Sequence, residues 1–184
     1  AFDLGKTTEI EGVLTVDQAV PWEAMGFAID PGWASVTVRD LLDHTSGMPI
    51  ARRSWLDDPG SCAIPLAGVL VLPPTPERGT WVYSNGNYCS LGLVIELVTG
   101  ERFDAAAYRL VLAPAGIVGP HLTVDGSGPD DAPYAKGVAR FDRLGGAGQW
   151  MASTDDIAAL LAAITPADRD VLAWPGIIAD QYGW

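Results

Sequence analysis

The sequence predicts a single, mostly helical domain with short strands at best. Apolar residues recur at helical spacing in several segments, and residues that favour helix starts and ends flank those segments. Few runs alternate between apolar and polar residues as the strands of a large sheet would. The chain has 184 residues, of which 48% are apolar, and this length and composition suffice for one domain with its own core.

The first quarter of the chain is predicted to contain one extended piece and one short helix. Within residues 9–22, the segment Glu11–Gln18 is predicted to be a short extended piece that comes after a turn. Thr37 has the character of a helix N-cap, because Asp40 three residues later completes a capping-box pattern. The helix that begins there is short and ends before Gly47.

The middle of the chain carries the clearest helical pattern. Residues 49–80 are rich in Pro, Gly and Asp, and this composition predicts a long irregular segment that contains one helical turn. A helix comes next over about residues 86–99, where apolar residues recur at helical spacing and Gly100 provides the C-cap. A second helix is predicted over about 103–112, and Pro114 stops it.

The last third of the chain is predicted to hold a loop and then a further helix. Residues 118–143 have the composition of a loop. Ser153 is predicted to cap the helix, with Asp156 at the third helical position. The apolar face of this helix is formed by Ile157, Leu160, Leu161 and Ile164.

The distribution of charge argues against two kinds of partner. The net charge is −12, and an acidic surface repels phosphate backbones, so nucleic-acid binding is not expected. Lys6 and Lys136 are the only lysines, and no basic cluster is available for an anionic membrane. No apolar run free of charged and turn residues reaches membrane-spanning length, and the first residues lack the features of a signal peptide.

The sequence indicates neither a metal site nor a cofactor site. His44 and His121 are the only histidines, and no His/Cys cluster has the spacing of metal ligands. The chain also contains no dinucleotide-binding fingerprint, no P-loop and no Gly-x-Ser-x-Gly nucleophile turn.

The two cysteines allow two interpretations. Cys62 and Cys89 either form one disulfide or are separate thiols. The place of Cys89 early in an apolar helix favours a buried free thiol, because free cysteine packs as a small hydrophobe. Cysteine usage therefore leaves the cellular compartment open.

The candidate catalytic residues lie where the helix of residues 86–99 begins. Tyr83 and Asn85 are two residues apart, so a phenol and a carboxamide are expected side by side at a rigid edge. Such a pair suits acyl transfer, in which a proton moves and an amide is held. The alternative is that Ser84 or Asn85 only caps the helix and that Tyr83 packs beneath it.

Together with the segment Val36–Pro49, this motif resembles the serine hydrolases of the β-lactamase and penicillin-binding type. That group includes class C β-lactamases, D-alanyl-D-alanine carboxypeptidases and related esterases. The resemblance implies that Tyr83 transfers a proton to and from the nucleophile and leaving group, and that Asn85 binds the acyl-amide carbonyl of the substrate. It gives residues 41–48 a framing role at the site. His44 and Ser46 are two residues apart at a helix end and do not readily face each other, so they are not expected to act as base and nucleophile.

A second matching segment, Gly145–Ile157, resembles the glycine-rich stretch that precedes the family's Ser-Thr-x-x-Asp-Leu helix. The resemblance places glycines there so that the backbone passes close to the site, and we assign Gly148 to substrate binding. Trp150 is expected to line the substrate pocket, with a place in the core as the alternative.

The chain departs from the family pattern at both ends. The nucleophile motif Ser-x-x-Lys is absent, because Asp3 precedes Lys6 and Pro133 precedes Lys136 at that spacing. The Glu11–Asp17 segment resembles the family segment immediately after the nucleophile helix, of which about three turns are lacking. The family's third motif and closing strands are also not found. The resemblance therefore implies an α+β fold over 1–184, in one incomplete domain that is mainly the helical part.

These observations predict a serine hydrolase that forms an acyl-enzyme with a β-lactam, a D-Ala-D-Ala peptide or a small ester. Without Ser-x-x-Lys, the chain is expected to be inactive alone. The alternatives are a non-catalytic binding relative or a fragment that pairs with a complementary chain or with itself. A periplasmic or secreted location is favoured over a cytoplasmic one, because cell-wall substrates require export.

Overall fold

The structure, a computed structural model, describes residues 15–51, 61–118, 121–122, 146–148 and 150–163. Helix dominates among these residues, as the sequence predicts. The elements in chain order are η2 (Pro31–Trp33), α2 (Val38–Leu42), α4 (Ala63–Leu70), α5 (Asn85–Thr99), α6 (Phe103–Ala107), η3 (Tyr108–Leu112), β1 (His121–Leu122), β2 (Trp150–Met151) and α7 (Thr154–Ala163). Strands β1 and β2 pair antiparallel, with His121 opposite Met151.

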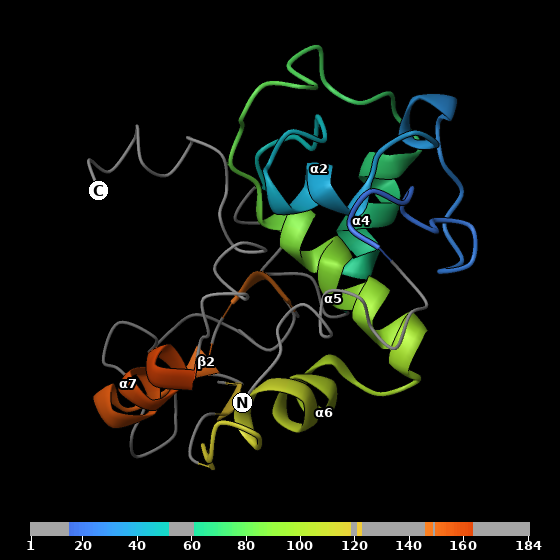
Figure 1. Cartoon of the computed structure of the whole chain (residues 1–184). Coiled ribbons are helices and arrows are strands. Elements are labelled where there is room, and N and C mark those ends of the chain that lie inside the picture. Colours follow the sequence, from blue (N-terminus) through green and yellow to red (C-terminus); the bar gives the residue numbers. More distant parts are fainter. Residues whose placement is uncertain (1–14, 52–60, 119–120, 123–145, 149, 164–184) are drawn as a thin grey trace, which may run out of the picture.

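Helix α5 is the central element of the fold. It contacts α2, α4 and α6, and Figure 1 shows it running from the α2–α4 side of the molecule towards α6. Helices α2 and α4 lie beside its first turns, whereas α6, β2 and α7 lie in the lower part of the view. The N-terminus of α5, which carries the candidate residues, is therefore held between elements that are distant in the sequence.

Two tryptophans anchor the core beside α5. Trp22 and Trp33 are almost completely buried and meet edge to face, with ring centroids 6.1 Å apart. Each indole nitrogen has an acceptor, because Trp22 Nε1 donates to the Trp33 carbonyl at 3.1 Å and Trp33 Nε1 donates to that of Leu72 at 2.7 Å. Buried indoles need such partners, and here the partners also fix the loops that surround the core. The core further includes Val36, Leu41, Met48, Leu66, Leu70 and Cys89.

Local capping interactions define the ends of three helices, as predicted. Thr37 and Asp40 form a reciprocal capping box at the start of α2. Gly100 ends α5 in the left-handed conformation with φ of 67°. At α7, Ser153 Oγ accepts the N–H of Asp156 at 3.1 Å, and the Asp156 carboxylate accepts the N–H of Ser153 at 2.9 Å.

The structure differs from the predictions in three short segments. Residues 15–18 form a turn, with the Gln18 N–H bonded to the Thr15 carbonyl at 3.2 Å, and not an extended piece. Helix α4, at eight residues, is longer than the single turn predicted within 49–80. Its Pro65 lies in the first turn, where proline is tolerated, and its Leu66 is buried in the core. Strand β1 lies within the predicted loop, most of which is outside the described residues.

The expectation of free thiols was wrong, because Cys62 and Cys89 form a disulfide. Their Cα atoms are 6.2 Å apart although 27 residues separate them in the sequence. Helix α4, which the composition of its segment did not predict, packs on α5 and thereby brings Cys62 at its N-cap to Cys89 in α5. The bond ties α4 to the helix that carries the candidate site.

The apolar face predicted for the last helix is only partly covered, since Leu160 is half-buried. None of the residues of α7 is buried, and the side chains of Ile157 and Leu161 are 50% and 62% exposed. The remaining predicted member, Ile164, lies outside the described residues. Among the described helices, none is long and apolar enough to cross a membrane.

Candidate active site at the start of helix α5

The structure brings Tyr83 and Asn85 together at an exposed edge. The Tyr83 hydroxyl donates a hydrogen bond of 2.6 Å to Oδ1 of Asn85. The Tyr83 side chain is 52% exposed, and Asn85 is half-buried at the first position of α5. The phenol and the carboxamide therefore lie side by side where a substrate from solvent can reach both.

Ser84 performs the capping role between these two residues. Its hydroxyl oxygen accepts the N–H of Gly86 at 3.1 Å and donates to the carbonyl of Pro49 at 2.6 Å. Because Ser84 caps the helix, Asn85 does not have to, and its carboxamide is available to Tyr83. The alternative in which Tyr83 packs beneath the helix is wrong, since half of its side chain is in solvent.

His44 joins the turn after α2 to the segment around Tyr83. Its carbonyl oxygen accepts the N–H of Val82 at 2.9 Å, and its Nδ1 accepts the N–H of Ser84 at 3.3 Å. The Nδ2 of Asn87 lies 2.9 Å from the same Nδ1. This arrangement supports the framing role that the sequence predicted for residues 41–48.

Ser46 is placed as a structural hydroxyl. It is fully buried, its oxygen accepts the N–H of Met48 at 3.0 Å, and it donates to Oδ1 of Asn87 at 2.5 Å. Both of its hydrogen-bonding functions are thus used within the fold. This agrees with the interpretation that His44 and Ser46 are not a base–nucleophile pair.

Aromatic rings surround the imidazole of His44. The centroid of its ring lies 4.9 Å from that of Tyr83, 5.0 Å from that of Tyr88 and 6.1 Å from that of Trp81. Burial lowers the pKa of His44, which keeps the imidazole neutral near pH 7. Burial, together with the negative charge of Asp43, raises the pKa of Tyr88, so that phenol also stays neutral.

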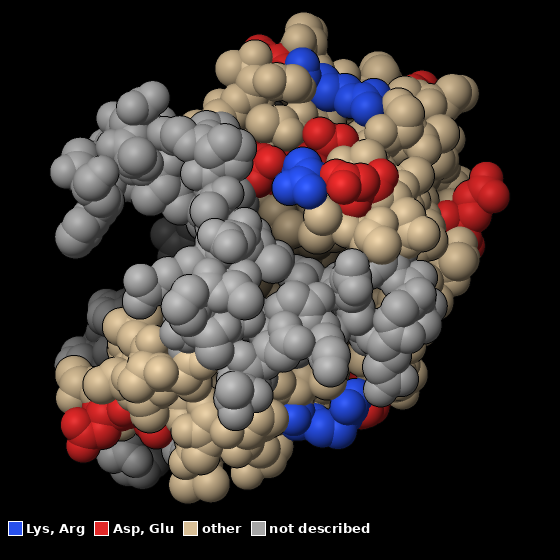
Figure 2. Space-filling model, in the orientation of Figure 1, with Lys and Arg blue, Asp and Glu red and all other residues tan. Residues whose placement is uncertain are grey.

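Charged side chains of both signs lie on the surface of the molecule. Figure 2 shows Lys/Arg and Asp/Glu side chains interleaved on the upper part of the face in view. Arg39 pairs with Asp17 at 2.7 Å, and both side chains are largely exposed. Such an exposed pair contributes little to stability.

The glycine-rich segment approaches α5 closely at Gly146. A Cβ built on Gly146 would overlap the carbonyl oxygen of Tyr88 and lie 2.9 Å from the Gly92 nitrogen. Gly148, selected from the sequence, has nothing within 4 Å of such a Cβ, but its φ of 127° favours glycine. Sequence reasoning recognised the segment but did not select Gly146, because nothing local distinguishes one glycine of the run from the next.

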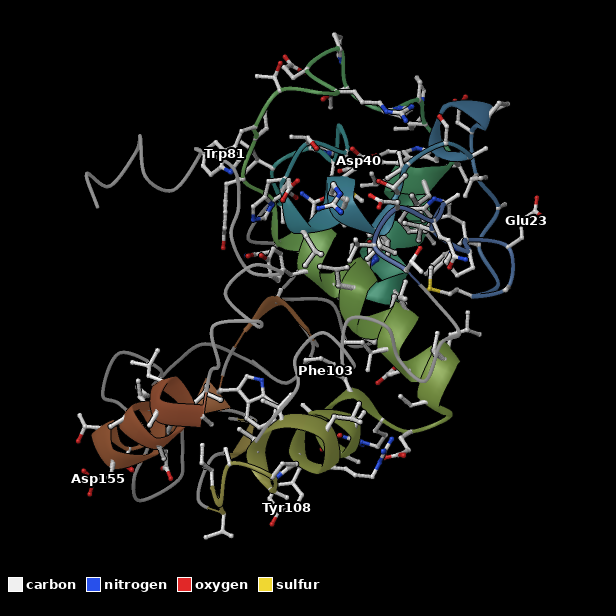
Figure 3. All side chains as sticks on the ribbon, in the orientation of Figure 1. Glu23, Asp40, Trp81, Phe103, Tyr108 and Asp155 are labelled. Carbon is white, nitrogen blue, oxygen red and sulfur yellow. A yellow bond between two sulfur atoms is a disulfide. The ribbon has the colours of Figure 1, made fainter. Side chains whose placement is uncertain are left out.

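Trp150 lies in a different part of the structure from Trp81 and the rings around His44. Its ring meets that of Phe103 edge to face at 6.3 Å, and Figure 3 shows Phe103 well apart from Trp81. Among the described residues, no hydrogen bond or ring contact joins Trp150 to Tyr83 or Asn85. Trp150 lines an apolar cavity of about 400 Å³ together with Ala107, Val111, Leu112, Ile117, Ala152, Asp156, Ile157 and Leu160.

The described residues contain no group of three or more His, Cys, Asp or Glu side chains arranged to hold a metal ion. The Tyr83–Asn85 edge offers side-chain groups of its own. These are a phenol that can exchange a proton and a carboxamide that can bind a carbonyl group, with a buried polar network behind them.

The sequence matches the family model described as Beta-lactamase over residues 11–177. Among curated proteins, it is 27% identical over 117 residues to the Unguisins hydrolase ungD of Aspergillus violaceofuscus. That match covers 58% of this chain and 20% of the relative.

The fold is similar to solved structures of several proteins. The structure of FmtA from Staphylococcus aureus matches with a TM-score of 0.65 at 20% identity, over 86% of this chain and 47% of that one. A D-stereospecific amidohydrolase from Streptomyces sp. matches with a TM-score of 0.60 at 23% identity, over 85% of this chain and 55% of that one. The chain thus spans about half the length of these structures.

Proposed function

The chain belongs to the Beta-lactamase family, and we propose that it supplies one edge of the active site of a serine hydrolase. The reaction is the transfer of an acyl group from an amide-type carbonyl to a serine, followed by hydrolysis. β-Lactams, D-Ala-D-Ala peptides and small esters are the substrates that fit. The name of one similar structure, a D-stereospecific amidohydrolase, supports an amide within this set.

The observation that carries this proposal is the hydrogen bond between Tyr83 and Asn85. Because the Tyr83 hydroxyl donates to Asn85 Oδ1, the carboxamide directs its oxygen to Tyr83 and keeps its two Nδ2 hydrogens as donors. A substrate carbonyl that accepts from Nδ2 then lies next to the phenol. Tyr83 is assigned the proton transfer, and Asn85 the binding of the acyl-amide carbonyl.

Two further assignments concern the substrate beyond the reacting carbonyl. Gly148 and Trp150 stay predicted substrate-binding residues. The apolar cavity beside Trp150, of about 400 Å³, has room for an apolar substrate side chain. Gly148 lies two residues before Trp150, in a backbone conformation that favours glycine.

A second candidate function is favoured by one observation in the sequence. No serine among the 184 residues is followed three positions later by lysine. Removal of the nucleophile from a hydrolase site costs about a millionfold in rate. A polypeptide of this sequence alone is therefore proposed not to form an acyl-enzyme, and to retain at most the carbonyl-binding edge of a non-catalytic relative.

Intact-mass measurement after incubation with a penicillin tests this point. We expect the mass to stay unshifted for the 184-residue polypeptide. A stoichiometric adduct of one acyl group would show that a serine within this sequence is the nucleophile, and would overturn the assignment.

The role of Tyr83 is tested in a polypeptide that combines this sequence with the family's Ser-x-x-Lys segment. Tyr83→Phe is expected to lower kcat by about 10²–10⁴-fold, the usual contribution of a general acid–base group. Tyr108→Phe is the matched control, because Tyr108 is also a partly exposed phenol but lies in η3. Equal turnover in the two variants would place the active site elsewhere.

A further inference from the structure

We propose that His44 is a positioning residue for Tyr83, which it holds through one backbone and one side-chain hydrogen bond to the residues on either side. Its carbonyl oxygen binds the N–H of Val82 and its Nδ1 binds the N–H of Ser84. The direction of the phenol is then set by an acceptor nitrogen on the imidazole. An effect of His44 on turnover rests on the proposed function, whereas its effect on the orientation of the Tyr83 side chain does not.

The two hydrogen bonds act on opposite sides of a single residue. Tyr83 itself makes one described hydrogen bond, to Asn85, and its side chain is 52% exposed, so packing alone does not hold it. Fixing the amides of Val82 and Ser84 restricts the backbone dihedrals between them, and hence the direction in which the Tyr83 side chain leaves the chain. The His44 ring then lies 4.9 Å from the Tyr83 ring and limits its rotation.

The backbone of His44 is strained into a conformation that makes this two-point contact. It has φ of 56°, and among the described residues it is the only non-glycine with positive φ. Such a conformation is unfavourable for most residues, and it is found at sites where the surrounding structure fixes it. Here it turns the carbonyl towards Val82 while the imidazole reaches Ser84.

The hydrogen-bond network determines which nitrogen of His44 carries the proton. A backbone N–H can only donate, so the contact from Ser84 requires Nδ1 to be an acceptor. Asn87 Nδ2 then also donates to Nδ1 of His44. The Oδ1 of Asn87 accepts a hydrogen bond from the Ser46 hydroxyl, and the Ser46 oxygen accepts one from the Met48 N–H. Only the neutral imidazole with its proton on Nε2 satisfies every member of this buried chain.

Two substitutions at position 44 separate the role of the acceptor atom from that of the positive-φ backbone. Asparagine tolerates positive φ and carries Oδ1 about where histidine carries Nδ1, so His44→Asn keeps the acceptor. Glycine adopts positive φ without strain but has no acceptor, so His44→Gly keeps only the backbone conformation. A purely conformational role predicts that glycine does at least as well as asparagine, and a positioning role predicts the reverse.

The experiment is NMR spectroscopy of the 184-residue protein labelled at histidine and tyrosine. In the wild type we expect the ¹⁵N shifts of His44 to show a bare Nδ1 and a protonated Nε2. We further expect a nuclear Overhauser effect between the Tyr83 ring and the Asn85 side-chain amide, which should persist in His44→Asn and vanish in His44→Gly. The ring signals of Tyr108 serve as the control, and should be the same in all three proteins.

Three results would overturn the inference. They are a His44 proton on Nδ1, a Tyr83–Asn85 Overhauser effect that survives in His44→Gly, and the disappearance of that effect in a folded His44→Asn. If His44→Gly does not fold, the inference is still tested by the tautomer of His44 in the wild type and by the Tyr83–Asn85 Overhauser effect in His44→Asn. The proposed function is tested separately, in the polypeptide that also contains the Ser-x-x-Lys segment. If the NMR results are as expected but Tyr83→Phe does not change turnover in that polypeptide, the proposed function is refuted and the positioning role of His44 stands.

Discussion

Gly146 lies directly against the carbonyl oxygen of Tyr88, so closely that no side-chain carbon fits between them. This contact brings the glycine-rich segment onto the second turn of α5, on the helix that begins with Asn85. The segment around Gly146 and the start of α5 are more than 50 residues apart in the sequence, yet their backbones are in contact. The contact is possible because Gly146 has no side chain.

Gly146→Ala is expected to destabilise the protein by about 1–3 kcal/mol, because the added methyl group forces backbone atoms apart. Urea unfolding measures this change. Gly68→Ala is the control, since Gly68 lies in α4 with nothing within 4 Å of the added carbon, and alanine there should stabilise slightly. Equal stability of the wild type and Gly146→Ala would show that the contact does not constrain the fold.

Reduction of the Cys62–Cys89 disulfide is expected to lower the free energy of unfolding by about 3.5 kcal/mol, which is the loop-closure contribution for the 27-residue separation. Denaturant unfolding with and without a thiol reductant measures it. The Cys62→Ala, Cys89→Ala double variant should show the same loss and no response to reductant. A wild type that is equally stable in both conditions would contradict the expected contribution.

The buried His44 is expected to make the folded chain less stable as the pH falls below 6.5. Burial lowers the pKa of His44 from its ordinary value of 6.5, so between the lowered value and 6.5 the unfolded chain binds more protons. The stabilising contribution is therefore complete above 6.5 and is lost as the pH falls through that window. Urea unfolding at several pH values should show this slope in the wild type and a smaller slope in His44→Asn.

The titration of Asp156 and that of Asp43 do not imitate this effect. Hydrogen bonds from Ser153 lower the pKa of Asp156 from 3.8, so its contribution is lost only below that value. Burial raises the pKa of Asp43, which makes stability fall as the pH rises above 3.8, the opposite direction. An unchanged slope in His44→Asn would assign the pH dependence to groups other than His44.

The exposed face of α7 is expected to promote self-association. Ile157 and Leu161 are one helical turn apart and more than half of Leu161 is in solvent, so the pair forms an apolar stripe. Sedimentation velocity should show concentration-dependent association in the wild type, and less in the Ile157→Gln, Leu161→Gln double variant. Ile50→Gln is the control, because Ile50 is as exposed but lies outside α7. A wild type that stays monomeric at every concentration would contradict this.

The helix ends and the Tyr83–Asn85 edge could be predicted because each depends on residues close in sequence. The capping box joins Thr37 to Asp40, and the hydrogen bond of the candidate site joins residues two apart. Such interactions are available to the chain before any distant segment packs, so the pattern of residue types indicates them directly.

The remaining features were decided by the tertiary structure, because they depend on which distant segments meet. The composition of residues 49–80 predicted no helix of the length of α4, and it is the packing of α4 on α5 that brings Cys62 to Cys89. The choice of Gly146 as the contact with α5, and the hydrogen-bond partners of the imidazole of His44, likewise came only from packing. Residue type by itself determined the local caps and the Tyr83–Asn85 hydrogen bond, whereas long-range packing selected the disulfide and the groups that surround that pair.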